Sequence, residues 1–268
     1  MSAHRQGATR GSPQLYDEIG VGYAERRQPD PRIARAIAEA LGCTADTGGA
    51  GTPSVVNVGA GAGSYEPVDC RVCALEISRE MIQQRPTGSA PVVQASAGAM
   101  PFATGSFAAA LAVLTLHHWP DWRQGLTEMR RVAPDRQVLL SWDPEVAGFW
   151  LTEDYFPAIS EIDRRILPPI RALEEVLGDF RVQPLPIAHD CSDGFLGAYW
   201  RRPEAYLDAS VRSAISTFGK LEPGDVDAGL QRLRRDLDDG GWRRRYGSLL
   251  ELPELDLGYR LIVAGPRA

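Results

Sequence analysis

The segment Val55-Val56-Asn57-Val58-Gly59-Ala60-Gly61-Ala62-Gly63-Ser64 decides the fold. An apolar run leads directly into glycines at alternate positions, which lets the backbone turn sharply and approach a ligand closely at a helix N-terminus. The pattern predicts a strand followed by a loop that holds a nucleotide-like cofactor. Ser64 replaces the third glycine of the dinucleotide fingerprint, and no Gly-Lys-Ser/Thr is present, which disfavours a dinucleotide or a Walker site. A glycine-rich turn without a ligand is the alternative.

Short apolar runs alternate with helix-sized spacers around this loop. They cover residues 54–58, 71–75, 91–94, 107–114 and 137–142. This rhythm is typical of a parallel sheet with right-handed crossovers. After Asp143 the pattern indicates amphipathic helices over 145–177 and 201–242 and two closing strands over 181–187 and 256–264. We therefore predict an α/β fold, a doubly wound, mostly parallel, seven-stranded Rossmann-like sheet with a helical lid insertion.

The chain is expected to divide into four parts. Residues 1–13 are predicted as a disordered leader, 14–145 as a cofactor-binding core with N-terminal capping helices, 146–254 as a mostly helical lid that includes one sheet strand near 181–187, and 255–268 as the closing strand. Within Tyr16–Leu41 two helices are expected on either side of a Pro29-Asp30-Pro31 corner.

The composition favours a cytoplasmic protein with a small partner. The 268 residues are 44% hydrophobic, and 29 Lys and Arg against 35 Asp and Glu give a net charge of −6, which argues against nucleic-acid binding. No apolar run is long enough for a membrane span, and the N-terminus has no apolar signal region. A chain of this length does not need disulfides for stability. The sequence does not indicate an oligomeric state.

Four cysteines in a chain of this size fit a reducing compartment. Cys70-Arg-Val-Cys73 has no second Cys or His pair at zinc-finger spacing, so we interpret both cysteines as strand residues and expect no metal site.

An acidic residue ends the second apolar run. Glu76 lies 17 positions after Gly59 and directly follows the strand predicted over 71–75. A carboxylate at this place can accept hydrogen bonds from both hydroxyls of a ribose. A solvent-exposed loop acid is the alternative.

The motifs in order resemble the class I S-adenosylmethionine-dependent methyltransferases, most closely the small-molecule group typified by ubiquinone and menaquinone enzymes. They are the glycine segment, Ala74-Leu75-Glu76-Ile77-Ser78, Met100-Pro101-Phe102 and Leu114-Thr115-Leu116-His117-His118-Trp119. The resemblance covers about Tyr16 to Pro144 and implies S-adenosylmethionine as cofactor and S-adenosylhomocysteine as product. A protein that binds this cofactor without transferring the methyl, such as a cyclase, is the competing reading.

The resemblance implies roles for individual residues. The glycines would line the methionine part of the cofactor, Glu76 the ribose, and Ile77 and Met81 the adenine. The implied cofactor contacts are Tyr16, Arg27, Asn57, Gly59, Ala60, Gly61, Gly63, Glu76, Ile77, Met81, Ser96, Ala97 and Leu114. Arg27 could pair with the methionine carboxylate. The alternative is that Tyr16 and Tyr23 only pack their helix on the sheet.

Two positions depart from the family pattern. Asn57 stands where an acid is usual, which removes charge near the cofactor amino group. Ser96 stands where an Asp usually accepts a hydrogen bond from the adenine, and a neutral acceptor is weaker by about 1 kcal/mol.

Methyl transfer needs no fixed catalytic motif, because the cofactor carries the reactivity and the protein positions the acceptor. The predicted catalytic residues are His117, His118 and Tyr23, and further candidate bases are Asp143, His189 and Asp190. The segment Gly194–Pro203 mixes aromatic side chains with Arg201 and Arg202, which could receive an apolar or anionic acceptor or could simply form a packed helix. Tyr23 and Trp200 are expected to line a covered cavity.

Overall fold

The computed structural model describes residues 27–43 and 52–265. The predictions for residues 1–13, for the first N-terminal helix and for Tyr16 and Tyr23 lie outside these ranges.

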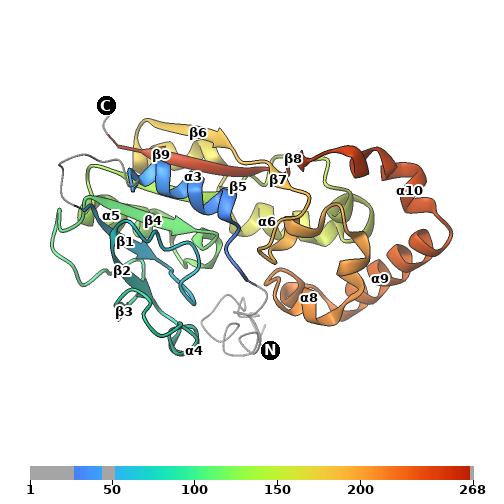
Figure 1. Cartoon of the computed structure of the whole chain (residues 1–268), viewed down its shortest axis with the longest axis horizontal. Coiled ribbons are helices and arrows are strands. Elements are labelled where there is room, and N and C mark those ends of the chain that lie inside the picture. The colour runs from blue at the N-terminus through green and yellow to red at the C-terminus, as the bar shows by residue number, and fades with distance from the viewer. Residues whose placement is uncertain (1–26, 44–51, 266–268) are drawn as a thin grey trace, which may run out of the picture.

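A seven-stranded sheet forms one half of the molecule, with strand order β3-β2-β1-β4-β5-β9-β6 (Figure 1). Strands β1 to β5 are parallel, and β9 runs antiparallel to both β5 and β6. The strands are β1 (Ser54–Val58), β2 (Arg71–Glu76), β3 (Val92–Gln94), β4 (Ala109–Val113), β5 (Gln137–Trp142), β6 (Phe180–Pro184) and β9 (Tyr259–Ala264). This confirms the predicted fold class. The strand order reverses at β1, where ligands of such sheets bind beyond the carboxyl ends of the strands.

Helices cover both faces of the sheet because successive side chains of each strand point to opposite sides. Val55 packs in the cluster that contains α3 (Pro31–Leu41), whereas Val56 packs in the cluster that contains α5 (Trp122–Val132). The Asp30 side chain accepts a hydrogen bond from the Arg32 backbone N–H and caps α3, which begins at Pro31 as the Pro-Asp-Pro corner predicts. The other helices of this half are α4 (Arg79–Gln83), η1 (Leu116–His118), η3 (Ile170–Leu173) and α7 (Glu174–Leu177).

The second half of the molecule is a helical lid with a core of its own (Figure 1). Trp150, Tyr155, Phe156 and Trp242 are almost fully buried in that core, and edge-to-face ring contacts join Trp150 to Tyr155 and Trp242. The lid contains η2 (Leu151–Tyr155), α6 (Pro157–Ile166), η4 (Leu196–Tyr199), η5 (Pro203–Leu207), α8 (Ala209–Ser213), η6 (Phe218–Lys220), α9 (Pro223–Asp238), α10 (Gly241–Tyr246) and η7 (Gly247–Glu251).

The prediction of long helices over 145–177 and 201–242 is wrong, because each range contains several short helices. Prolines start α6, η5 and α9, and Pro168 and Pro169 follow the end of α6. Proline lacks a backbone N–H and restricts the residue before it, so each proline begins or ends a short helix.

The strand predicted over 181–187 is two strands. Its first part is β6, and its last residue begins β7 (Ile187–Ala188), which pairs with β8 (Glu254–Leu255) in a separate small sheet. Pro184 and Pro186 lie at the break, where neither can donate a hydrogen bond to a neighbouring strand.

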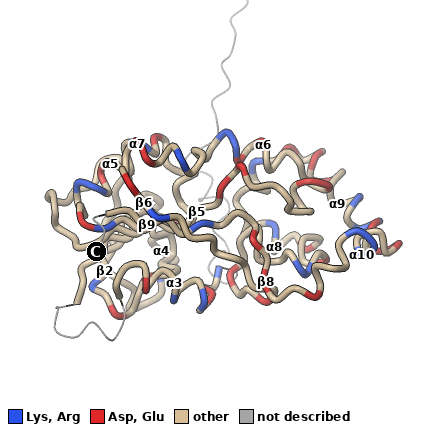
Figure 2. The backbone as a smooth tube through the Cα atoms, turned by 90° about the horizontal axis from the view of Figure 1, so that it is seen from above, with Lys and Arg blue, Asp and Glu red and all other residues tan. Residues whose placement is uncertain are grey.

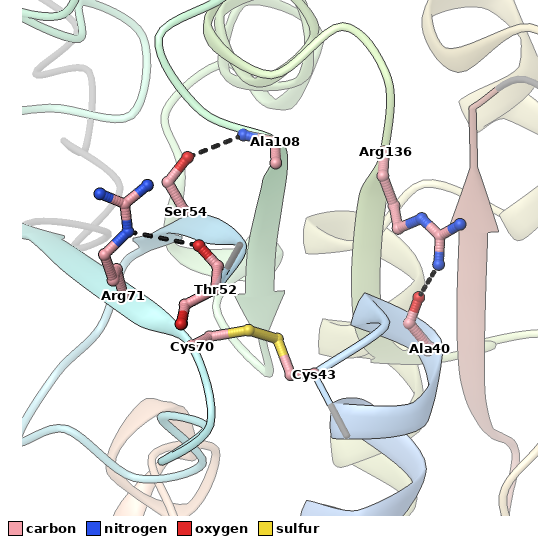
Figure 3. Close-up of a disulfide and its surroundings, with 8 residues drawn as sticks. All are labelled: Ala40, Cys43, Thr52, Ser54, Cys70, Arg71, Ala108 and Arg136. Atoms are coloured by element: carbon pink, nitrogen blue, oxygen red, sulfur yellow. Dashed lines mark hydrogen bonds between the residues drawn. A yellow bond between two sulfur atoms is a disulfide. The ribbon is translucent and has the colours of Figure 1, made fainter. Parts of the chain in front are cut away.

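A disulfide joins Cys43 to Cys70, although 27 positions separate them (Figure 3). It links the chain after α3 to the residue before β2, and the two Cα atoms lie 5.6 Å apart. The interpretation of Cys70 as a strand residue is therefore wrong, while Cys73 does lie in β2 as a free thiol. The paired cysteines also do not fit the expectation of a reducing compartment.

Acidic and basic residues are interspersed over both halves of the molecule (Figure 2). Within residues 27–43 and 52–265, no helix has the length and apolar character that a bilayer span requires.

Candidate active site

The glycine loop is fixed to the end of β2. The backbone N–H groups of Gly59 and Ala60 both donate to the carbonyl of Leu75, at 2.8 and 3.1 Å. Gly59 has a φ of 70°, and a Cβ there would collide with the Thr115 hydroxyl. Only glycine therefore allows the loop to pass this close to the end of β4.

Glu76 is held in a defined orientation beside this loop. Its Oε2 accepts a hydrogen bond from the Gly61 N–H and its Oε1 accepts one from the Ser78 N–H, both at 2.8 Å. Each oxygen retains a further lone pair. Ile77 follows directly, and its side chain is 47% exposed although it is large and apolar. A fixed carboxylate next to an uncovered apolar side chain fits a ribose followed by an adenine ring.

Met81 and Ala60 are buried parts of the same cradle. The Met81 Cε would lie only 3.3 Å from a Cβ at Gly61, so this side chain lies directly behind the loop. Gly63, like Gly61, has a positive φ and continues the turn.

Asn57 is buried below the loop and has an acidic neighbour that the sequence did not indicate. Its Nδ2 donates to Glu66 Oε1 at 3.4 Å, and Glu66 forms an ion pair with Arg85 at 2.7 Å. Arg85 also donates to the Gly61 carbonyl. A carboxylate therefore does lie beside position 57, although it comes from Glu66.

Ser96 and Ala97 lie in the turn after β3. The Ser96 Oγ accepts a hydrogen bond from the Gly98 N–H at 3.2 Å, and Ala97 is buried. The serine hydroxyl is thus oriented by its own turn and keeps a lone pair and a proton for a ligand.

Arg27 is placed against the glycine loop by Asp193. Its guanidinium donates to both carboxylate oxygens of Asp193, at 2.5 and 3.2 Å, and the Tyr65 hydroxyl donates to the same carboxylate at 2.9 Å. The Ser64 hydroxyl donates to the Arg27 carbonyl. The Asp193 side chain is fully buried and comes from the segment between β7 and η4, and the sequence did not indicate it.

A chamber opens beyond the carboxyl ends of β4 and β5, next to this cradle. The space between its lining residues, including the part open to solvent, is about 850 Å³. Leu114 lies on its wall with a φ of 49°, a left-handed conformation that is strained for a leucine. The apolar wall includes Leu114, Trp142, Val146, Phe149, Phe195 and Tyr259.

His117 and His118 line this chamber side by side, with ring centroids 3.7 Å apart. Burial, with the nearby charges of Lys220 and Arg27, lowers the pKa of His118 to about 3. Burial also lowers the pKa of His117 well below its ordinary value, and its Nδ1 has no hydrogen-bond partner among the described residues. Both imidazoles are therefore neutral near pH 7, which suits them to hydrogen bonding more than to accepting a proton.

Asp163 of α6 is a chamber residue that the sequence analysis missed. Its Oδ2 accepts a hydrogen bond from the Trp142 indole N–H at 3.0 Å, while its Oδ1 is buried and has no partner among the described residues. Burial raises the pKa of this carboxyl to about 6. Asp143, one of the predicted candidate bases, also lines the chamber.

Several sequence-derived candidates lie elsewhere. Trp200 is fully buried in the core below the chamber instead of lining it. The side chains of Arg201 and Arg202 donate to backbone carbonyls, and neither residue lines the chamber where a methyl acceptor would bind. Neither His189 nor Asp190 lines the chamber, and Asp190 forms an ion pair with Arg32 on the surface.

Comparison with known proteins gives a family assignment. Residues 56–140 match the model of a methyltransferase domain. A protein of known structure from Anabaena variabilis, described as a methyltransferase from an antibiotic biosynthesis pathway, is 33% identical with a TM-score of 0.81. The match covers 90% of this chain and 99% of that one. No curated protein matches the chain.

Two more distant structures share the fold. A Haemonchus contortus phosphoethanolamine N-methyltransferase, solved with S-adenosylhomocysteine, has a TM-score of 0.52 at 12% identity, over 97% of this chain and 58% of that one. SpnF, described as a 4+2 cyclase, has a TM-score of 0.52 at 15% identity, over 96% of each chain. With the fold and the site geometry, the match to the Anabaena protein shows that the chain belongs to the family of S-adenosylmethionine-dependent methyltransferases.

Proposed function

We propose that this enzyme transfers the methyl group of S-adenosylmethionine to a small molecule held in the chamber beyond β4 and β5. The observation that carries the proposal is the chamber itself, which has aromatic walls and a few convergent polar groups. Two of its lining residues connect it to the glycine loop: the Arg27 carbonyl accepts a hydrogen bond from Ser64, and Leu114 precedes Thr115, which lies against Gly59. The interspersed surface charges support a small acceptor over a nucleic acid (Figure 2).

The residues around the glycine loop fit the cofactor. Glu76 would accept the ribose hydroxyls, and Ile77 and Met81 would flank the adenine, with Ser96 and Ala97 at its edge. When bound, S-adenosylmethionine supplies an electrophilic methyl group on a sulfonium. Leu114 would lie next to this methyl, because it lines the chamber and directly precedes Thr115, which lies against Gly59 of the loop.

Arg27 is proposed to approach the methionine carboxylate as a pre-oriented cation. Its ion pair with Asp193 fixes the guanidinium beside the loop, so little conformational entropy remains to be lost on binding. Tyr16 and Tyr23 remain proposed contributors to the cofactor site and the chamber.

The acceptor is proposed to belong to secondary metabolism, because the Anabaena relative is described as part of an antibiotic biosynthesis pathway. The proposed location is the cytoplasm. This rests on the low cysteine content, with the Cys43–Cys70 disulfide as the observation against it.

Calorimetry and product analysis test this function. S-adenosylhomocysteine should bind saturably and NAD should not, because the glycine spacing and Glu76 fit one nucleoside without a pyrophosphate. With a metabolite extract, S-adenosylmethionine should be converted to S-adenosylhomocysteine and a methylated product should appear in the mass spectrum. Binding of S-adenosylhomocysteine without any methylated product would favour a cyclase or a binding protein, and binding of NAD alone would exclude the assigned cofactor.

Ser96→Ala is expected to weaken S-adenosylhomocysteine binding only about threefold, because one neutral hydrogen bond is lost. Ser96→Asp should tighten binding or leave it unchanged, since a carboxylate accepts more strongly from an adenine amino group. Titration calorimetry of the two variants beside the wild type checks both. A tenfold loss in Ser96→Asp would show that this turn does not face the adenine.

A further inference from the structure

The chamber is lined by one buried acid that has an unpaired oxygen atom, and a lysine next to the chamber acts on this acid. Asp163 is 6% exposed and its Oδ1 lacks a hydrogen-bond partner among the described residues. An unpaired buried carboxylate oxygen is unfavourable for stability. It therefore indicates that a bound ligand donates a hydrogen bond to this oxygen.

Trp142 fixes the orientation of this carboxylate. Its indole N–H binds Oδ2, and its ring lies 4.7 Å from the ring of His117. Carboxylate, indole and imidazole therefore form one connected group from α6, β5 and η1, and all three residues line the chamber.

Lys220 is the one lysine in a sequence with 29 Lys and Arg residues, and its charge acts on Asp163. It follows the chamber residues Ser216 and Thr217, is partly buried, and interacts electrostatically with Asp163. Its positive charge also acts on both chamber histidines. Among the described residues its side chain makes no hydrogen bond or close ion pair, so its ammonium is not committed to another group.

A neutral hydroxyl that ionises during the reaction suits this arrangement, because Asp163 can take its proton while the nearby positive charge of Lys220 favours the oxyanion. The aromatic walls favour a planar, apolar body on that hydroxyl.

We propose that Asp163 is the catalytic base for O-methylation of a phenol or enol in this chamber, and that the nearby positive charge of Lys220 favours the ionised oxygen. The proposal rests on the proposed function and names its acceptor class. The acceptor O–CH₃ bond forms as the sulfonium S–CH₃ bond breaks, the hydroxyl proton passes to the Asp163 carboxylate, and a neutral thioether leaves.

The Trp142 indole N–H provides a test that does not depend on turnover. Its NMR signal, assigned with Trp142→Phe, should titrate with a midpoint near pH 6, because burial raises the pKa of Asp163 to that value. The other charged or titratable groups that interact with Asp163 are Lys220, Arg164 of its own helix and Tyr259, while the neutral His117 contacts the Trp142 ring that binds it. Asp163→Asn should abolish the titration, and Lys220→Met should move its midpoint upward.

Matched ligands test the acceptor class in the same experiment, with S-adenosylhomocysteine bound. 1-Naphthol should lower the midpoint, since a hydroxyl donating to the carboxylate favours its ionised form, while naphthalene should leave it unchanged or raise it by desolvation. If 1-naphthol and naphthalene move the midpoint alike, or if the indole does not titrate between pH 4 and 8, the proposal is wrong.

Turnover of 1-naphthol and 1-naphthylamine is the second test of the proposal. Asp163→Asn should lower kcat for the naphthol about 100-fold and remove the rise of kcat/KM through pH 6. Lys220→Met should lower kcat about tenfold and Lys220→Arg should restore most of it, whereas the exposed Glu161→Gln on the same helix should change it less than twofold. Asp163→Asn should not lower Tm at pH 8, because it removes a buried charge.

Methylation of the amine but not of the phenol, or wild-type turnover of the phenol by Asp163→Asn, would overturn the proposal. If neither probe is methylated, the indole titration decides it. Failure of S-adenosylhomocysteine to bind in calorimetry would instead contradict the proposed function.

Discussion

Glu76→Ala should lower the affinity for S-adenosylhomocysteine about 1000-fold. Two hydrogen bonds from ribose hydroxyls to a charged acceptor are lost, each worth about 1.5–3 kcal/mol. The backbone N–H groups of Gly61 and Ser78 lose their acceptor in the same substitution, so the glycine loop also loses the contact that orders it. Titration calorimetry of the folded variant measures the loss.

Two further variants separate the ribose contact from a general effect of charge. Glu80→Ala removes a neighbouring carboxylate whose observed partner is Gln84, and it should bind within about twofold of the wild type. Glu76→Gln should also bind weakly, because its amide NH₂ would face one of the two backbone donors. If Glu76→Ala binds like the wild type while its circular dichroism is native, the ribose does not lie at the end of β2.

The sheet could be predicted from the sequence because its signals are local. Apolar runs of strand length occur between helix-length spacers, and the predicted bounds of β1 and β5 agree with the structure. The turn at Gly59 could be predicted as well, because the apolar run and the glycines that indicate it are adjacent in the sequence. The lid was harder to predict, because its helices are short and are bounded by prolines whose effect depends on tertiary packing.

The Cys43–Cys70 bond could not be predicted, because it depends on a long-range approach. The two residues meet only when α3 packs against the sheet and brings its C-terminal end to the start of β2 (Figure 3). Spacing along the chain carries no information about that approach.

The sequence pattern around Asp163 did not reveal it as a site residue. Its neighbours Glu161, Arg164 and Arg165 make the segment look like a solvated helix surface. One signal was nevertheless present. Ile159 and Asp163 are four positions apart, so they share one helix face, and both are buried. An acid within an apolar stripe is a candidate functional group, but only the packing of α6 against Trp142 shows which site it serves.

Trp200→Ala should lower the free energy of unfolding by about 3–5 kcal/mol, because a fully buried indole is replaced by a cavity. The indole N–H also donates to the Ile187 carbonyl at 2.9 Å, and that buried acceptor would lose its partner. For a chain of this length the expected fall in Tm is roughly 10 °C. Thermal melting followed by circular dichroism measures it.

The position of Trp200 explains why the loss should be large. Its ring packs with the sheet core, and its backbone carbonyl accepts a hydrogen bond from the indole N–H of Trp150, which belongs to the lid core. The residue therefore connects the two halves that enclose the chamber. Trp122→Ala is the matched control, since Trp122 is partly exposed beside Arg123 and should cost less than half as much. A Trp200→Ala variant with native Tm and reduced turnover would instead place this side chain on the chamber wall.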